Sequence, residues 1–191
     1  LGNPAETRIG IGDYSLECWV KANQVSVAKS IFTRYGSSSN DGVFISIDAG
    51  GAPSTAFYEN NTNVQLASSE TISVDTWNHI SVTADRDSTT GLKIYLNGVL
   101  TGSANISALS GDSSPQANNY IGADWNLSGT RWFDGQISQV RIYNRALSAE
   151  EVKASYNGQR VPFEYRGANQ TGSITGAASN FDNVTTGWTG G

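Results

Sequence analysis

The sequence contains very few residues of several types, and these shortages limit what the chain can be. There is no methionine, one cysteine, one histidine and four prolines among 191 residues. With Cys18 alone, an intrachain disulfide is impossible. Because Cys18 lies inside a strand pattern, we expect a buried core thiol. The lack of methionine and the start at Leu1 predict that the chain is a fragment or a processed piece of a larger protein.

Charge is also scarce. Charged residues make up 15% of the chain, and the formal net charge is -5. Lys and Arg form no basic stripe, which argues against nucleic acid as a partner. No apolar run approaches the roughly 18 residues that span a bilayer, so we expect no membrane insertion. Low charge with abundant Gly, Ser, Thr and Asn favours an extracellular or virion-surface β-protein.

What the sequence does contain is a series of short strand patterns separated by polar turns. Apolar and mostly polar residues alternate over residues 14–21, as in a β-strand. Asn97-Gly98 between two apolar runs predicts a type I′ hairpin, in which both central residues have positive φ. At least eight short strands at even spacing predict one antiparallel β-sandwich domain. The later strand candidates are residues 30–34, 43–48, 55–58, 64–67, 77–84, 92–96, 99–100, 120–122 and 140–143.

One short helix follows the last strand. Ser148 and Glu151 have the spacing of a capping box, and Leu147 and Val152 have that of a hydrophobic staple. Gly158 can end this helix of about two turns. In the preceding strand, Ile137 is out of phase with Val140, which predicts a bulge near residues 138–139 or burial on both faces.

Four segments, in this order, resemble the laminin-G-like domains of the concanavalin A-like lectin/glucanase superfamily. They are YSLECWVK at 14–21, DTWNHISVTAD at 75–85, LKIYLNGVL at 92–100 and FDGQISQVRIYNRALSAEEV at 133–152. The resemblance implies an all-β fold, an antiparallel two-sheet jelly-roll sandwich with one short C-terminal helix. It also implies a non-catalytic recognition module of secreted, cell-surface or phage structural proteins.

We expect three parts along the chain. Residues 1–160 form the laminin-G-like jelly roll. Residues 161–179 form an extended strap and a linker rich in Gly, Ser and Thr. Residues 180–191 resemble the start of a second β module, cut off at Gly191.

The sequence gives little support for catalysis. His79 is the only histidine and lies in a framework motif of the resemblance, so we expect a structural role. Glycoside hydrolysis needs two carboxyl groups about 5 to 9 Å apart. The alternating Glu-x-Asp-x-x-Glu strand motif of related glucanases is absent, and we therefore predict that the domain is not an enzyme.

The resemblance implies a calcium site at the rim of the sandwich. Asp124, directly after residues 120–123, matches the position of one ligand, and Glu59, Asn60 or Asn61 is a candidate for a second, with Asn60 preferred. Relatives often carry an acidic pair where this chain has Ser138-Gln139, which removes possible ligands. The alternative is that Asp124 only caps a turn.

Sugar sites combine an aromatic face with polar groups for the hydroxyls. A loop that contains Asp124, Trp125 and Asn126, with Trp132 across it, has this composition. We predict that Tyr58, Asn60 and Asn61 line the same rim. Alternatively, Trp125 or Trp132 closes the sandwich edge as a core aromatic.

These patterns lead to a predicted function. We expect a lectin-like carbohydrate-binding or adhesion module that recognises a glycan or another host-surface ligand. Its context would be a larger virion protein, such as a phage tail fibre or decoration protein, or a secreted protein, and its other partners would be subunits of that assembly. One alternative is a purely structural packing or oligomerisation module without a ligand. Another is an accessory domain of a polysaccharide-degrading enzyme.

Overall fold

The computed structural model describes residues 9–36, 40–113, 117–127 and 129–158. Within these ranges the chain forms ten strands and one helix. The linker predicted for 161–179 and the second module predicted for 180–191 lie outside the described residues. The helix, α1 (Ala149–Gly158), is too short to cross a membrane.

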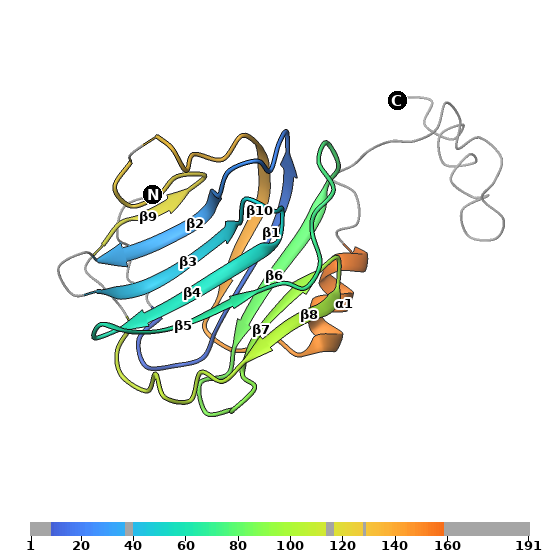
Figure 1. Cartoon of the computed structure of the whole chain (residues 1–191). Helices are drawn as coiled ribbons and strands as arrows, with labels where there is room; N and C mark the ends of the chain where they lie inside the picture. The colour runs from blue at the N-terminus through green and yellow to red at the C-terminus, as the bar shows by residue number, and fades with distance from the viewer. Residues whose placement is uncertain (1–8, 37–39, 114–116, 128, 159–191) are drawn as a thin grey trace, which may run out of the picture.

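The strands form two five-stranded antiparallel sheets (Figure 1). The first sheet has the spatial order β10 (Gly135–Tyr143), β1 (Tyr14–Ala22), β6 (Asn78–Ala84), β7 (Leu92–Leu96) and β8 (Val99–Ala104). The second has the order β5 (Thr62–Ala67), β4 (Pro53–Glu59), β3 (Asp41–Ile47), β2 (Lys29–Gly36) and β9 (Asn119–Ile121). The predicted all-β jelly-roll sandwich with one C-terminal helix is confirmed.

The core lies between the two sheets and is built by the alternation of side chains along each strand. Leu16, Cys18 and Val20 of β1 point into it and are fully buried. Val43 and Ile45 of β3 face them from the second sheet. Each such side chain contributes about 1.5 to 3 kcal/mol by leaving water. Cys18 is the buried core thiol that was expected, and burial raises its pKa to about 12.

Two local predictions about the backbone are confirmed. Asn97 and Gly98 have φ values of 51° and 77° and join β7 to β8. In β10 the register against β1 shifts between the partners of Glu17 and Trp19, and Gln139 has a φ of 53°. This is the bulge expected at residues 138–139.

Helix α1 covers the outer face of the first sheet. Its predicted capping box is present, because the Glu151 amide donates to Ser148 Oγ (3.2 Å) and the Ser148 amide donates to Glu151 Oε2 (2.9 Å). Leu147 and Val152 pack with Tyr95 in a small second core. As a result β1 and β6 are buried on both faces. In the described part of the chain, no helix covers the outer face of the second sheet (Figure 1).

Candidate functional site

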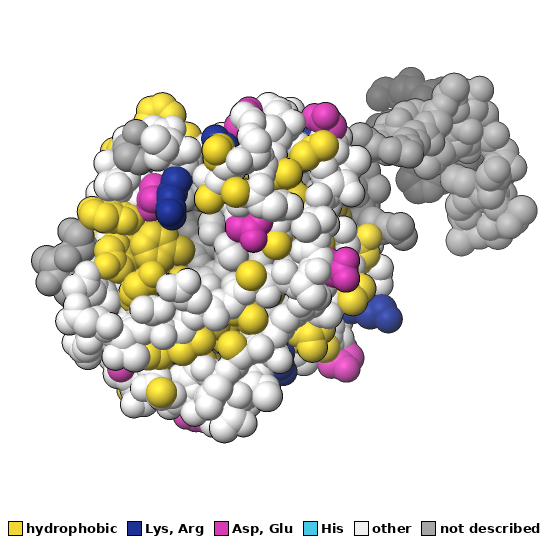
Figure 2. Space-filling view, in the orientation of Figure 1, with side chains coloured by type: hydrophobic (Ala, Val, Ile, Leu, Met, Phe, Trp, Pro, Cys, Tyr) yellow, Lys and Arg dark blue, Asp and Glu magenta, His cyan; other side chains and the backbone are white. Residues whose placement is uncertain are grey.

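A cavity of about 770 Å³ opens on the uncovered face of the second sheet. This volume is within the ~300 to 1,000 Å³ of small-molecule sites. Figure 2 shows hydrophobic side chains gathered on this face, beside one acidic and one basic group. We call it the outer-face cavity. It is lined by Ser30, Tyr35, Phe44, Ser46, Ser54, Thr55, Ala56, Tyr58, Gln65, Leu66, Ala67, Asp124, Trp125, Asn126, Thr130 and Arg131.

Four of these residues form an aromatic wall. The ring of Tyr35 lies 4.9 Å from Phe44, 5.4 Å from Tyr58 and 5.5 Å from Trp125, measured between centroids. Three different segments therefore supply one apolar surface: β2, the β3–β4 pair and the loop after β9. Such aromatic contacts stabilise the wall beyond the burial of area alone.

Gly42 makes the contact between the two tyrosines possible. It lies between Tyr35 and Tyr58 in the sheet register, so a larger residue would separate the two rings. Its φ is +137°, and a Cβ atom there would lie 2.0 Å from the carbonyl oxygen of Arg34. The position requires glycine on both grounds.

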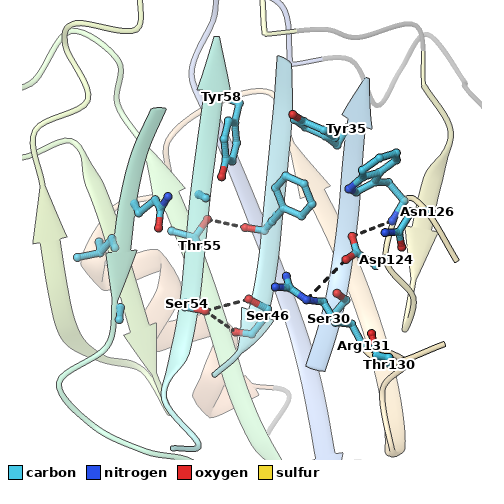
Figure 3. A pocket seen from close by; sticks show the side chains of 16 residues that line it. Ser30, Tyr35, Ser46, Ser54, Thr55, Tyr58, Asp124, Asn126, Thr130 and Arg131 are labelled. Carbon is cyan, nitrogen blue, oxygen red and sulfur yellow. Dashed lines mark hydrogen bonds and ion pairs between the residues drawn. The ribbon is translucent and has the colours of Figure 1, made fainter. Parts of the chain in front are cut away.

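Small polar residues form the floor next to this wall. Ser46 and Ser54 lie opposite each other on β3 and β4, and their hydroxyl oxygens are 2.9 Å apart (Figure 3). Ala56 is paired with Phe44 and Gln65 in the neighbouring row. Because Ser and Ala are short, the face is hollow here, whereas Phe44 and Tyr58 rise beside it.

The loop between β9 and β10 closes the other side of the cavity. Its start is held by the Gly122 amide, which donates to the Ile31 carbonyl (2.9 Å). Further along, the Ser30 amide donates to the Arg131 carbonyl (2.9 Å). Both contacts are to β2, so the loop folds over the end of that strand. It presents Asp124 to the cavity (Figure 3).

Asp124 is the buried charge of the site. The residue is 5% exposed, and its Oδ1 accepts a hydrogen bond from the Trp125 amide (2.8 Å). Its Oδ2 lies 3.8 Å from Nε of Arg131, a side chain that is itself 55% exposed. The Asp124 carbonyl also accepts from the Leu127 amide (3.1 Å), so the residue caps a turn as well as facing the cavity.

The structure brings together only part of the predicted sugar site. Asp124, Trp125, Asn126 and Tyr58 all line the cavity. Trp132 is 52% exposed and does not line it.

The two asparagines lie beyond the aromatic wall, in the turn between β4 and β5. Asn60 and Asn61 have φ values of 47° and 67°. The Asn60 amide donates to Asp41 (2.7 Å), and the Asn61 side chain accepts from Asn40. Neither residue lines the cavity, and their part in binding stays a prediction.

Sequence reasoning missed most of the cavity lining on β2, β3 and β4. The available signal was the alternation of residues 43–47, where Phe44 and Ser46 have the opposite phase to the core residues around them. Single exposed apolar residues are common, so Phe44 alone does not mark a binding surface; the contiguous aromatic patch with Tyr35 and Tyr58 does. The pairing that places Tyr35 beside Trp125 is not visible in the sequence.

The oxygen atoms near Asp124 give limited support for a calcium site. Calcium takes six to eight oxygen ligands, and no cluster of three or more Asp, Glu, His or Cys side chains that could hold a metal occurs in the described ranges. The Arg131 guanidinium also competes for the carboxylate. Glu59 is engaged elsewhere, since it pairs with Arg86 at 2.6 Å. An ion at Asp124 would therefore depend on amide and carbonyl oxygens and on water.

Comparisons with known proteins agree with this architecture. The profile of the Laminin_G_3 family, described as the concanavalin A-like lectin/glucanases superfamily, matches residues 3–153. None of the curated proteins matches the chain.

Several solved structures share the fold. A native heptameric SAP-like pentraxin from Limulus polyphemus has a TM-score of 0.62 at 15% identity, over 78% of this chain and 72% of the pentraxin. The botulinum neurotoxin serotype G binding domain has a TM-score of 0.62 at 20% identity, over 82% of this chain and 39% of that one. The CBM40 of the Ruminococcus gnavus IT-sialidase, solved with α2,3-sialyllactose, has a TM-score of 0.59 at 17% identity, over 77% and 84%.

At these identities the likenesses establish the fold. The family match is independent of them, and it covers all four sequence motifs in full. With the two-sheet sandwich and the capped helix, it shows that this chain belongs to the concanavalin A-like lectin/glucanases superfamily, as a laminin-G-like domain.

Proposed function

We propose that the chain is a non-catalytic glycan-binding module and that its ligand lies in the outer-face cavity. The observation that carries this proposal is the combination of an aromatic wall, serine hydroxyls on the floor and a carboxylate on the loop that closes the cavity. A sugar ring has one apolar face of C–H groups and a rim of hydroxyls, and the cavity offers a complementary surface for each.

A binding role also agrees with what is known of similar folds. The neurotoxin structure is a binding domain, and the sialidase CBM40 was solved with a bound sialyllactose. Among the described residues that line the cavity, Asp124 is the only carboxylate, whereas glycoside hydrolysis uses a pair. This composition supports binding over hydrolysis.

The test is a glycan array probed with the full chain and with two variants. Trp125→Ala removes one ring of the aromatic wall, and we expect it to weaken glycan binding by about tenfold or more, since stacked rings dominate such contacts. Trp132→Ala removes an equal ring that does not line the cavity, and it should bind like the unaltered chain. If no glycan binds, a purely structural packing module becomes the better proposal.

The biological context is a separate part of the proposal. We infer an extracellular or virion-surface location, in a phage tail fibre, a decoration protein or a secreted protein. The support is the family's usual setting together with low charge and a Gly- and Ser-rich composition. The sequence that flanks this chain in its coding region tests the idea. Flanking catalytic domains would instead favour an accessory domain of a polysaccharide-degrading enzyme.

Calcium binding at Asp124 and Asn60 stays a proposal. A calcium titration followed by thermal unfolding tests it, because an ion that binds only the folded state raises Tm. A rise in Tm that disappears in Asp124→Ala would support the site. The same Tm with and without calcium in both proteins would end the proposal.

A further inference from the structure

We propose that the outer-face cavity takes a neutral sugar, and that Asp124 binds two adjacent hydroxyl groups of it. This inference rests on the proposed glycan-binding function and names the class of glycan. It depends on three features of the site: the charge of the cavity, the fixed position of the carboxylate, and its remaining capacity to accept hydrogen bonds.

The first feature is that the cavity carries no net positive charge. Among the described residues that line it, Asp124 and Arg131 are the only charged side chains, and they lie 3.8 Å apart. Their charges offset each other at the cavity mouth. The whole chain has a net charge of -5, so its general field repels anions as well. An acidic sugar therefore finds no uncompensated cation in this site.

The second feature is that Asp124 cannot move away from a second anion. Its side chain is 7% exposed, and the Trp125 amide holds Oδ1 at 2.8 Å. A sugar carboxylate or sulfate that approached Arg131 would come close to this buried carboxylate. Two like charges at short range in a partly buried site are strongly unfavourable. Selection against acidic glycans follows from this arrangement.

The third feature is the acceptor capacity of Asp124. An ionised carboxylate offers about four acceptor positions. The Trp125 amide fills one, and the Arg131 contact at 3.8 Å is longer than a hydrogen bond. Sugar hydroxyls donate hydrogen bonds, and those to an ionised acceptor are about twice as strong as neutral ones. Asp124 and Trp125 both line the cavity (Figure 3), so a sugar ring stacked on the indole would share this space with the carboxylate.

The experiment uses the full chain on an array that carries each neutral glycan beside its sialylated or sulfated counterpart. The affinity for the best neutral glycan is then measured at low and high salt. The measurement is repeated with Asp124→Asn, with Arg131→Gln and with Trp132→Ala as a control away from the cavity. Thermal unfolding of each variant shows whether it is folded.

We expect the neutral member of a pair to bind about tenfold or more tightly than the acidic one, with little dependence on salt. Asp124→Asn should weaken neutral binding about tenfold, while Trp132→Ala leaves it unchanged. Preference for acidic glycans, with strong salt dependence and loss in Arg131→Gln, would overturn this inference and leave the glycan-binding function standing. Binding to no glycan would overturn both. If Asp124→Asn fails to fold, the charge preference and salt dependence of the unaltered chain decide the matter.

Discussion

At the scale of single residues, His79 and Glu17 form a buried titratable pair on the outer face of the first sheet, under α1. Both side chains are fully buried, and His79 Nε2 lies 3.9 Å from Glu17 Oε1. Tyr143 and Ser155 donate hydrogen bonds to the other carboxylate oxygen. The imidazole packs against the rings of Trp19 (5.2 Å) and Tyr156 (6.0 Å), away from the cavity. This placement agrees with the structural role expected for the only histidine.

The pair makes stability depend on pH in a way that one substitution can isolate. Burial, with a smaller effect of Arg141, lowers the pKa of His79 to about 4. The unfolded chain therefore binds a proton at His79 below about pH 6.5 that the folded chain does not bind until about pH 4. Unfolding is favoured as pH falls through this window. Burial raises the pKa of Glu17, so the folded chain holds a proton on this carboxyl that the unfolded chain loses above about pH 4.5. This contribution lowers stability as pH rises, and it therefore opposes the contribution of His79.

We predict that His79→Gln removes the histidine's contribution to the dependence of unfolding free energy on pH. The slope between about pH 6.5 and 4 should fall by up to one proton, which is about 1.4 kcal/mol per pH unit. Chemical denaturation at a series of pH values measures this slope independently of any constant loss of stability. Equal slopes in the two proteins would show that His79 titrates as it does in the unfolded chain.

Gly42 provides a second prediction at this scale. We expect Gly42→Ala to destabilise the fold by about 2 kcal/mol or more, because the new Cβ meets backbone at a strained φ. It should also weaken glycan binding, since Tyr35 and Tyr58 meet across this position. Gly12→Ala is the control, because no atom lies closer than 4.0 Å to its Cβ position. Denaturant unfolding that shows the same loss for both variants would contradict the argument.

At the scale of elements, α1 is joined to the sandwich by few but specific contacts. Val152 is its one buried residue, and Ser155 donates to Glu17 at 2.8 Å. Gly98 of the β7–β8 turn lies against Tyr156, where a Cβ atom would be 3.0 Å from Cδ1 of the ring. A helix of this length needs such tertiary contacts and its cap, because isolated short helices are unstable in water.

The cap can be tested alone. Ser148→Ala removes the acceptor of the Glu151 amide, and we expect a loss of about 1 kcal/mol of stability. Hydrogen exchange of the α1 amides should rise more than exchange in β1, because the helix opens before the sheet. Lys153→Ala, on an exposed position of the same helix, should change stability by less than about 0.5 kcal/mol. A Ser148→Ala protein as stable as Lys153→Ala would show that the cap contributes nothing.

These elements also show what sequence reasoning can and cannot reach. The Asn97-Gly98 turn, the capping box and the bulge at 138–139 follow from local chemistry, and all three were predicted. The sequence pattern of β1 and β6 is that of strands with one face in solvent. In β6, for example, Ser81 and Thr83 alternate with Ile80 and Val82. The outer faces of both strands are buried, because α1 returns from the end of the chain to cover them. Only the tertiary arrangement contains that information.

At the scale of the whole molecule, the two sheets are joined at one end by Arg86. This residue follows β6 of the first sheet, and its guanidinium pairs at 2.6 Å with Glu59, the last residue of β4 in the second sheet. It also donates to the carbonyls of Leu109, Gly10 and Gly111. The Arg86 side chain is 3% exposed, and these hydrogen bonds connect it to several loops.

We expect Arg86→Met to cost about 3 to 5 kcal/mol, since it leaves Glu59 with an uncompensated, mostly buried charge. The double variant Arg86→Met with Glu59→Gln has no unpaired carboxylate at this position. Its loss of stability should therefore be smaller than that of the single variant. Denaturant unfolding of both proteins measures the difference. A double variant that is less stable than Arg86→Met would contradict the argument, because it would show that the charged Glu59 carboxylate stabilises the fold without the arginine.

The sequence by itself determined the fold and much of its local structure. Periodicity, turn residues and capping residues act over a few positions, so they can be read along the chain, and the order of four motifs indicated the superfamily. It also placed Asp124, Trp125 and Asn126 in one loop. The tertiary structure alone decided which residues share the cavity, because Tyr35, Phe44 and Tyr58 meet through strand register and the loop reaches them by folding over β2. Trp132 lies outside the cavity for the same reason: proximity in sequence does not decide which way a loop presents its rings.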